Sequence, residues 1–439
     1  MPAACPARAH ATLPAMSDVF EEFRWRGLVS EHTEGLPELL ARERVTAYIG
    51  FDPTASSLHV GTLLTIMGLA RLQRFGHSPI AIVGGGTGMI GDPSGKTIER
   101  QLLSRDQIDE NVAGIRRQLE RFLDFDRAGN PARIINNADW LASFDLLGFL
   151  RDTGKYFTVN YILQKESVNR RLESEEGISY TEFSYLLLQA RDFLELFDRQ
   201  QCVLQMGGTD QWGNITAGID LIRKVRAKKV HGLVWPLMTT SAGTKFGKTE
   251  AGTVWLDAGR TSPFTFYQFW LNTDDRDAVA YLRYFTFLDR DAVAALDEAT
   301  SRAPEKREAQ RVLAREVTAL VHGADQVSRA EHASSLLFGE DITTLGADDV
   351  EAVFADVPST ELAADAFGGD GMSIVDLVAR VQLAPSKGEA RRLVQSGGIY
   401  VNNRRVADVQ MRVTREMAIG GRLFVVRKGQ KQNHLVRMT

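Results

Sequence analysis

The clearest structural signal in the sequence is residues 48–83, YIGFDPTASSLHVGTLLTIMGLARLQRFGHSPIAIV. Two short apolar runs within it, 48–52 and 79–83, have the length and composition of buried strands. The segment between them carries apolar residues at helical spacing, and Gly76 can end that helix. A strand, a helix and a second strand form a βαβ unit, so we predict a parallel sheet covered by helices.

The rest of the first 240 residues repeats these patterns. Apolar spacing predicts helices at 107–123, 143–154 and 180–197, and a strand-like run follows at 202–206. We therefore predict an α/β fold with a doubly wound, Rossmann-like parallel sheet. Ligands of such sheets bind at the carboxyl ends of the strands, so we expect the segments that follow the strands to line a site.

The chain beyond residue 262 predicts modules of a different kind. Residues 263–339 show helical patterns throughout and are typical of an all-α domain. Residues 340–370 contain 9 acidic residues and no Lys or Arg, and glycines lie at their end. This composition predicts a linker.

The tail, residues 371–439, is a small mixed module with a strong positive charge. It predicts a helix at 373–380, a second helix capped by Ser386, and short strands at 399–401 and 404–406. With 13 Lys+Arg and 4 Asp+Glu, its net charge is +9, against −4 for the whole chain. Such a concentration of charge is typical of a domain that binds a polyanion.

Composition places the chain among globular proteins. Its 439 residues, 44% hydrophobic and 25% charged, are enough for two or three domains, and no apolar run approaches a membrane span. Cys5 and Cys202 form no metal-ligand spacing, so a reducing, cytoplasmic setting is expected. Residues 1–16 lack acidic side chains and end at a second methionine. We expect a disordered or misassigned leader there, with a transit peptide as the alternative.

Two short motifs indicate a nucleotide site. HVGT at 59–62 places an imidazole and a hydroxyl at the start of the predicted helix, where free N–H groups and the helix dipole favour phosphate. KFGKT at 245–249 brings two ammonium groups on a glycine-flanked loop. Such groups suit a polyphosphate leaving group, whose negative charge grows in the transition state.

The glycine-rich segment GGGTGMIGDPSGKT, residues 84–97, resembles two other nucleotide motifs. It satisfies G-x-G-x-x-G after a strand, but the acids about 20 residues on, Asp109 and Glu110, fall inside a predicted helix instead of ending a strand. A P-loop would need glycine where Ile90 stands. We favour a third interpretation, in which small residues let the backbone approach a ligand and Asp92 meets a substrate cation.

The predicted helix at 180–197 has a polar stripe on a largely apolar surface. Tyr185, Gln189 and Asp192 are spaced i, i+4 and i+7, so they share one face. Buried polar groups need partners, and structural hydrogen bonds to neighbouring elements are one explanation. The other is that the stripe lines a pocket for a small zwitterion with a polar far end.

Longer segments carry a resemblance to a known family. In this order, YIGFDPTASSLHVG, VGGGTGMIGDPSGK, FSYLLLQARDF, MGGTDQWGNITAG and GTKFGKTE resemble bacterial-type tyrosyl-tRNA synthetases. HVGT and KFGKT are similar to the two signatures of class I aminoacyl-tRNA synthetases. The resemblance runs from about residue 17 to the C-terminus, and the tail resembles an S4-type RNA-binding domain.

The resemblance implies a homodimer that uses L-tyrosine, ATP and tRNA(Tyr). The implied domains are a Rossmann-like catalytic domain at 17–240 with an inserted dimer-interface segment at about 125–170, the KFGKT catalytic loop at 241–262, a helical anticodon-arm domain at 263–339, the acidic linker at 340–370 and an S4-like domain at 371–439.

The resemblance also assigns roles to residues. Tyrosine would be bound by Tyr48, Asp92, Tyr185, Gln189, Asp192 and Gln211. ATP would be bound by Asp52, Thr54, His59, Gly61, Thr62, Thr65, Gly208, Asp210 and Lys248. The catalytic residues would be Thr54, His59, Lys245, Lys248 and Thr249, assisted by Lys96 and Arg100. The tRNA would be bound by Lys387, Arg391, Arg392, Arg404 and Arg405.

The implied reaction needs no protein nucleophile. The tyrosine carboxylate attacks the α-phosphorus of ATP and releases pyrophosphate, and a hydroxyl of the terminal tRNA adenosine then displaces AMP. Positioning and charge stabilisation would supply the catalysis. Mg²⁺ is expected to arrive on ATP, since no carboxylate cluster suggests a metal site. Thr62 departs from the family pattern, which has a second histidine there, and this puts the ribose contact in doubt.

Three alternatives can be weighed against a tyrosine ligase. A nicotinamide oxidoreductase would need an acidic ribose ligand after a second strand, and the sequence shows none. A noncatalytic RNA-binding relative would lose signature side chains, yet His59, Lys245 and Lys248 are present. Among synthetases, tryptophan is the nearest other substrate, but the pair of Asp192 and Tyr48 favours a phenol over an indole.

Overall fold

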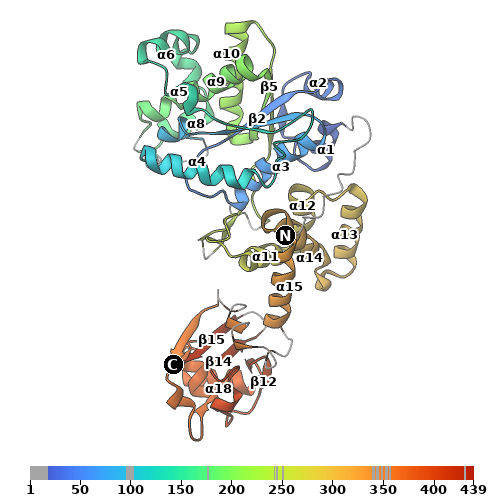
Figure 1. Cartoon of the computed structure of the whole chain (residues 1–439), viewed down its shortest axis with the longest axis vertical. Coiled ribbons are helices and arrows are strands. Elements are labelled where there is room, and N and C mark those ends of the chain that lie inside the picture. The colour runs from blue at the N-terminus through green and yellow to red at the C-terminus, as the bar shows by residue number, and fades with distance from the viewer. Residues whose placement is uncertain are drawn as a thin grey trace, which may run out of the picture. The chain divides into compact units, whose positions relative to one another are not determined.

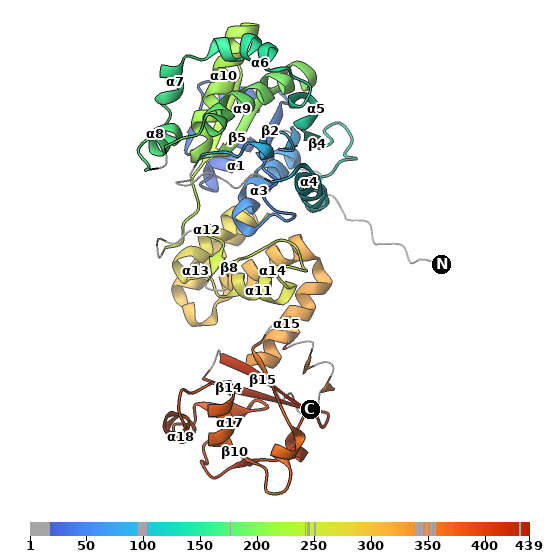
Figure 2. The same cartoon turned by 90° about the vertical axis from the view of Figure 1, so that its left-hand side faces the viewer.

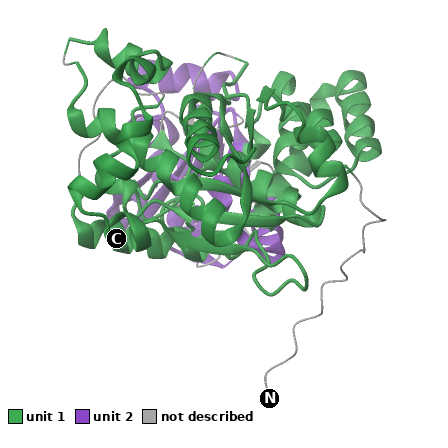
Figure 3. Ribbon diagram, turned by 90° about the horizontal axis from the view of Figure 1, so that it is seen from above, with its two compact units in different colours: residues 1–261, 270–321 green, residues 262–269, 322–439 purple. Residues whose placement is uncertain are grey.

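The computed structural model describes residues 18–94, 103–175, 177–241, 243, 246–249, 252–338, 342, 346–347, 350–351, 354, 357–429 and 432–439, with backbone only at 248–249 and 336–338. The chain divides into two compact units (Figure 3). The first comprises residues 1–261 and 270–321, and the second comprises residues 262–269 and 322–439.

A six-stranded sheet forms the centre of the first unit (Figure 1). Its order is β1-β6-β5-β2-β3-β4, and all neighbours are parallel except β1 and β6. The strands are β1 (Glu31–His32), β2 (Thr46–Phe51), β3 (Ser78–Val83), β4 (Arg133–Asn136), β5 (Cys202–Gly208) and β6 (His231–Trp235). The chain builds outward from β2 towards β4 on one side and from β5 towards β6 on the other. The switch point therefore lies between β2 and β5, where doubly wound sheets bind ligands.

Helices cover both faces of this sheet. They are α1 (Val19–Trp25), α2 (Leu36–Arg42), α3 (Val60–Arg74), α4 (Arg105–Leu119), α5 (Ala138–Leu141), α6 (Leu146–Asp152), α7 (Val159–Leu163), α8 (Glu166–Leu172), α9 (Tyr180–Gln200) and α10 (Trp212–Arg226). Helices α9 and α10 lie side by side and pack on one face (Figure 2), and α3 packs against β3. The predicted strands at 48–52, 79–83 and 202–206 and the helix at 180–197 are confirmed within a few residues.

Two buried arginines, one in α3 and one just after α1, contact the helices beyond residue 262. Those helices are α11 (Pro263–Leu271), α12 (Asp275–Phe285), α13 (Arg290–Arg302), α14 (Glu308–His322) and α15 (Ala324–Phe338). Residues 263–269 of α11, the last residue of α14 and all of α15 belong to the second unit. Arg71 of α3 donates to the carbonyls of Tyr284 at 2.7 Å and Thr286 at 2.8 Å, and Arg26 donates to that of Arg283 at 2.8 Å. These carbonyls end α12, where a cation also complements the helix dipole.

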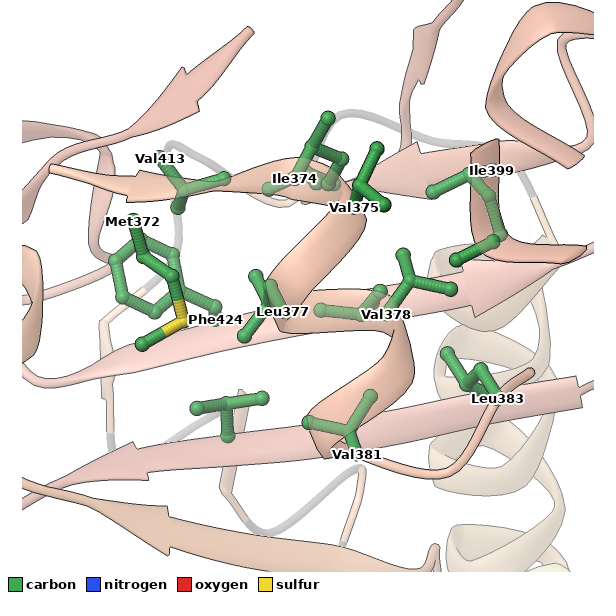
Figure 4. Close-up of a cluster of buried hydrophobic side chains, with 14 of the residues drawn as sticks. Met372, Ile374, Val375, Leu377, Val378, Val381, Leu383, Ile399, Val413 and Phe424 are labelled. Carbon is green, nitrogen blue, oxygen red and sulfur yellow. The ribbon is translucent and has the colours of Figure 1, made fainter. Parts of the chain in front are cut away.

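The second unit contains a five-stranded sheet of order β12-β11-β14-β15-β9. Its elements are β9 (Ser359–Leu362), β10 (Met372–Ser373), α17 (Ile374–Arg380), α18 (Lys387–Gln395), β11 (Ile399–Val401), β12 (Arg404–Val406), β13 (Arg412–Val413), β14 (Leu423–Lys428) and β15 (Gln432–Met438). Helix α17 buries Leu377 and Val378 against the sheet, beside Phe424 (Figure 4). The helices and strands predicted for the tail are confirmed.

One predicted linker segment is part of this sheet. Residues 359–362, inside the stretch expected to be a linker, form β9 and pair in parallel with β15. The linker interpretation is wrong for these four residues. The acidic composition favoured a solvated segment. Backbone pairing and the burial of Leu362 instead place residues 359–362 at the edge of the sheet.

Candidate active site

A cavity of about 1060 Å³ opens at the switch point between β2 and β5. Its walls come from segments that are far apart in the sequence, namely parts of 48–65, 82–94, 185–192, 205–211 and 235–246, together with Leu103, Asn137 and Arg170. It therefore lies where the topology of the sheet predicts a ligand.

The polar stripe of α9 faces this cavity. Tyr185, Gln189 and Asp192 all line it. Structural hydrogen bonds are also present, since the hydroxyl of Tyr185 donates to Asp52 at 3.2 Å, and Thr87 donates to the same carboxylate at 3.2 Å. The two explanations offered by the sequence are thus compatible, because these contacts hold the stripe in place at the wall.

Asp192 is a buried carboxylate held by two donors. The indole N–H of Trp140 donates to its Oδ1 at 2.7 Å, and the amide of Asn137 donates to its Oδ2 at 2.9 Å. Burial raises the pKa of Asp192 from 3.8 to about 7, while these two hydrogen bonds lower it. The carboxyl group therefore titrates near neutrality in a position fixed on both oxygens.

Two buried polar atoms of the cavity wall have no hydrogen-bond partner in the described part of the chain. They are the hydroxyl of Tyr48 and the side-chain oxygen of Gln205. These residues are paired in register on β2 and β5, and both line the cavity. Burial and the charge of Asp192 raise the pKa of Tyr48 well above 10, so its phenol is neutral. An unpaired buried polar group costs roughly 1–3 kcal/mol, so a polar ligand atom at this end of the cavity would be stabilised.

A chain of amides surrounds Asp92 on another wall. Gln211 donates to Asp92 at 2.7 Å, and Gln189 donates to Gln211 at 3.2 Å. Asn214 of α10 in turn donates to Gln189 at 3.0 Å. The backbone N–H of Ser94 also donates to Asp92, at 2.9 Å. A carboxylate fixed in this way favours a cationic ligand group.

The first turn of α3, which carries the HVGT motif, also lines the cavity. His59, Gly61, Thr62 and Thr65 line the cavity together with Asp52, Thr54, Gly208 and Asp210. The imidazole of His59 lies over Gly61, since a β-carbon at position 61 would come within 2.8 Å of Cε1 of His59. The ring also meets Trp255 edge to face, with centroids 6.1 Å apart.

Thr62 uses its hydroxyl within this turn. Its Oγ1 accepts from the backbone N–H of His59 at 3.2 Å and donates to the carbonyl of His59 at 2.7 Å. These contacts stabilise the start of α3 in the manner of a capping box. Thr62 lines the cavity, but its hydroxyl is engaged with the backbone of His59.

The centre of the KFGKT motif lies against the HVGT motif. Phe246 is buried and stacks on Phe285, with centroids 5.3 Å apart. Gly247 has φ +81°, and a β-carbon there would lie 2.7 Å from a methyl carbon of Val60. The backbone N–H of Val60 donates to Val254, the residue whose own N–H donates to Gly247. The two motifs therefore meet.

Several predicted residues fall outside the described part of the chain. Between Gly247 and Val254, β7 (Lys248–Thr249) and β8 (Gly252–Thr253) form a short antiparallel pair. The side chains of Lys248 and Thr249 are not described, nor are Lys245, Lys96 and Arg100. Their assignment stays a prediction.

Comparison with known proteins identifies the family. Residues 40–339 match the family of class I tRNA synthetases for tryptophan and tyrosine, and residues 349–436 match the tyrosine–tRNA ligase SYY-like C-terminal domain. The tyrosine–tRNA ligase of Roseiflexus castenholzii is 56% identical over 423 residues, which are 96% of this chain and 100% of that one. That of Geobacillus stearothermophilus is 52% identical, covering 96% and 99%. The chain belongs to the tyrosine–tRNA ligase family.

Solved structures agree with the fold of this ligase. A C-terminally truncated mitochondrial tyrosyl-tRNA synthetase from Aspergillus nidulans superposes with a TM-score of 0.65 at 31% identity, over 73% of this chain and 94% of that one. The tyrosyl-tRNA synthetase of Archaeoglobus fulgidus, at 16% identity and a TM-score of 0.54, shares the fold over 71% and 99% of the two chains. The predicted family and fold class are confirmed.

The basic residues assigned to tRNA lie on the second unit of the ligase. Lys387, Arg391 and Arg392 are exposed on α18, and Arg404 and Arg405 are exposed on β12. Arg405 donates to the carbonyl of Gly397 at 2.9 Å, just beyond the end of α18. The exposed basic side chains of α18 and β12 therefore come from two elements that are joined by this hydrogen bond.

Four residues that shape the cavity were not predicted from the sequence of the ligase. Asn137 and Trp140 support Asp192, Gln205 adjoins Tyr48, and Asn214 extends the amide chain. One signal was available, because Asn137 directly follows β4 and so occurs at the same edge of the sheet as Asp52, which directly follows β2.

Among the described residues, no group of three or more His, Cys, Asp or Glu side chains could hold a metal ion. None of the helices in the described part of the ligase is long and apolar enough to cross a membrane.

Proposed function

We propose that this ligase joins L-tyrosine to the 3′ end of tRNA(Tyr) through a tyrosyl-adenylate formed from ATP. The observation that carries the proposal is that Asp192 and Tyr48, whose hydroxyl has no partner among the described residues, line one cavity together with the HVGT motif. A phenol can donate to Asp192 and accept from Tyr48, which satisfies both groups. An indole offers a donor alone, so the pair supports tyrosine over tryptophan.

The remaining polar groups fit the rest of an amino acid. We infer that Asp92, Tyr185 and Gln189 receive the ammonium group, because they bring a carboxylate, a phenol oxygen and an amide oxygen to the same cavity, and Gln211 links Asp92 to Gln189. Gln211 lies beside Asp92 and would meet the carboxylate. The substrate would then lie with its carboxylate turned away from Asp192.

ATP would occupy the end formed by α3 and the segment after β5. Asp210, supported by Gly208, would accept from the ribose hydroxyls, and Asp52, Gly61, Thr62 and Thr65 would complete the nucleotide wall. Thr54 and His59 would contact the far phosphates. The tyrosine carboxylate oxygen then bonds to the α-phosphorus as the bond to the β-phosphate oxygen breaks, and pyrophosphate leaves.

Charge stabilisation at the leaving group is assigned to the second motif. Lys245, Lys248 and Thr249 would meet the departing pyrophosphate, whose negative charge grows in the transition state. Burial of Phe246 and the fit of Gly247 against Val60 support this assignment, since they hold the motif beside α3. Mg²⁺ would enter with ATP as part of the substrate.

The second step and its partners are also proposed. A hydroxyl of the terminal tRNA adenosine attacks the carbonyl carbon of the adenylate, and AMP leaves. The basic face of α18 and β12 would bind tRNA phosphates. A homodimer is supported by exposed apolar side chains on α6 and α7 within the predicted interface segment, namely Leu146, Leu147, Leu150 and Val159. A cytoplasmic location remains an expectation from the sequence.

Amino-acid-dependent pyrophosphate exchange with all twenty amino acids tests the activity and the substrate together. We expect exchange with tyrosine alone. Phenylalanine would leave the Tyr48 hydroxyl without a partner and would not donate to Asp192, and at about 1–3 kcal/mol for an unpaired buried group its kcat/KM should fall roughly 10- to 10²-fold. Preferred exchange with tryptophan or phenylalanine would refute the assigned phenol site.

The pKa of Asp192 predicts a pH dependence of tyrosine binding. The carboxylate is the stronger acceptor, so the KM for tyrosine should rise by up to about tenfold for each pH unit below 7. Trp140→Phe removes a hydrogen bond that lowers this pKa and should move the inflection to higher pH. Exchange measured from pH 5.5 to 8.5 shows both effects, and identical inflections in the two proteins would count against the assignment.

Substitution on α18 tests the tRNA surface. Arg391→Ala should weaken tRNA binding and reduce the slope of log K against log salt by about 1, because one phosphate contact is lost. Filter binding between 50 and 200 mM KCl measures the slope. Arg24→Ala, an exposed arginine of α1, is the control and should leave it unchanged. Equal slopes for Arg391→Ala and the wild type would show that Arg391 makes no phosphate contact with the tRNA.

Sedimentation equilibrium tests the homodimer. We expect a dimer for the wild-type ligase and a monomer for Leu147→Lys, because an interface that buries this leucine would have to bury an ammonium group. Glu298→Lys on α13 introduces the same charge at an exposed site outside this patch and should remain a dimer. A monomeric wild type would contradict the proposal.

A further inference from the structure

Arg170 of α8 is one of the residues that line the active-site cavity. Four carboxylates border the same cavity, from Asp52, Asp92, Asp192 and Asp210. Among the described lining residues, Arg170 alone is a Lys or Arg. Four carboxylates would repel a polyphosphate, so a cation at the cavity wall would favour the binding of such a substrate.

The neighbouring residue fixes the backbone of Arg170 relative to the substrate pocket. Arg171 donates to Glu182 of α9 through Nε at 2.9 Å and through Nη2 at 3.0 Å, and both side chains are almost fully buried. A buried two-point contact of this kind holds α8 against α9, the helix that carries the Tyr185, Gln189 and Asp192 stripe. Arg170 therefore projects from a backbone tied to the pocket wall.

The guanidinium of Arg170 is held by an exchangeable partner. It pairs with Glu166 at 2.6 Å, one turn earlier on the same helix, and the two side chains are 50% and 86% exposed. Exposed pairs at this spacing are weak. A phosphate group carries more charge than a carboxylate and also accepts two parallel hydrogen bonds from a guanidinium.

We propose that Arg170 binds a phosphate group of a substrate in the cavity and exchanges Glu166 for it. The inference rests on the proposed function, since that function brings two phosphate sources to this site. One is the triphosphate of ATP, and the other is the backbone at the 3′ end of tRNA. The chemistry of recognition is the same for both.

Steady-state kinetics of the full-length ligase separate the two sources. If the phosphate belongs to ATP, Arg170→Ala should raise the KM for ATP in tyrosine-dependent pyrophosphate exchange by about 10-fold. This is the effect expected when one charge-assisted hydrogen bond to the substrate is lost. Arg170→Lys, which keeps the charge, should lie between Arg170→Ala and the wild type. An unchanged KM for ATP with a raised KM for tRNA in aminoacylation would also support the proposal and assign the phosphate to tRNA.

Glu166→Gln distinguishes phosphate binding by Arg170 from a purely structural role of the Arg170–Glu166 pair, because the two predict opposite changes in KM. Removing the competing carboxylate should lower the KM for whichever substrate Arg170→Ala affects, about 2- to 3-fold, and should have no effect in the Arg170→Ala background. Arg116→Ala breaks an exposed i,i+4 pair with Glu120 on α4, away from the cavity, and should match the wild type.

Two outcomes would overturn the proposal. One is that Arg170→Ala leaves the KM values for both ATP and tRNA unchanged. The other is that Glu166→Gln raises KM as Arg170→Ala does, which would mean that the ion pair only stabilises α8. Failure of wild-type exchange with tyrosine would instead refute the proposed function, so the two failures are distinguishable.

Discussion

The parallel pairing of β2 with β5 is the constraint on which the site depends. These strands meet at the point where the sheet reverses its winding, so the segments that leave their carboxyl ends must diverge, and the cavity lies between them. Their register sets Tyr48 beside Gln205 and directs Asp52 and Asp210 to the same edge. A shift of one residue would turn these side chains to the opposite face.

Within the cavity, recognition depends on the cost of burying polar groups. Asp192 is kept in a place where burial raises its pKa to about 7, and Trp140 and Asn137 offset part of that cost. Tyr48 is buried with its hydroxyl unpartnered among the described residues. A site that leaves such groups incompletely paired favours a ligand that completes the set and disfavours one of similar shape that does not.

The wall formed by the HVGT and KFGKT motifs relies on close backbone packing. Gly61 leaves room for the imidazole of His59, and Gly247 adopts a positive φ where its β-carbon would strike Val60. The hydroxyl of Thr62 binds the backbone of His59, so the threonine in this motif stabilises the turn that carries the imidazole. Phe246 adds a buried anchor on the aromatic side chains of α12. Together these contacts bring two motifs that are almost two hundred residues apart into one wall.

Sequence alone determined the βαβ core, the strands β2, β3 and β5, the helix α9 and the positive tail, because apolar periodicity and charge are local properties. It also nominated Tyr185, Gln189 and Asp192 as one face, since helical spacing fixes that relation. Only the tertiary structure decided that β9 belongs to the C-terminal sheet, that Asn137 and Trp140 hold Asp192, and that Arg170 reaches the cavity. Those relations join elements that are distant along the chain, and no local spacing encodes which distant partners a strand or side chain will meet.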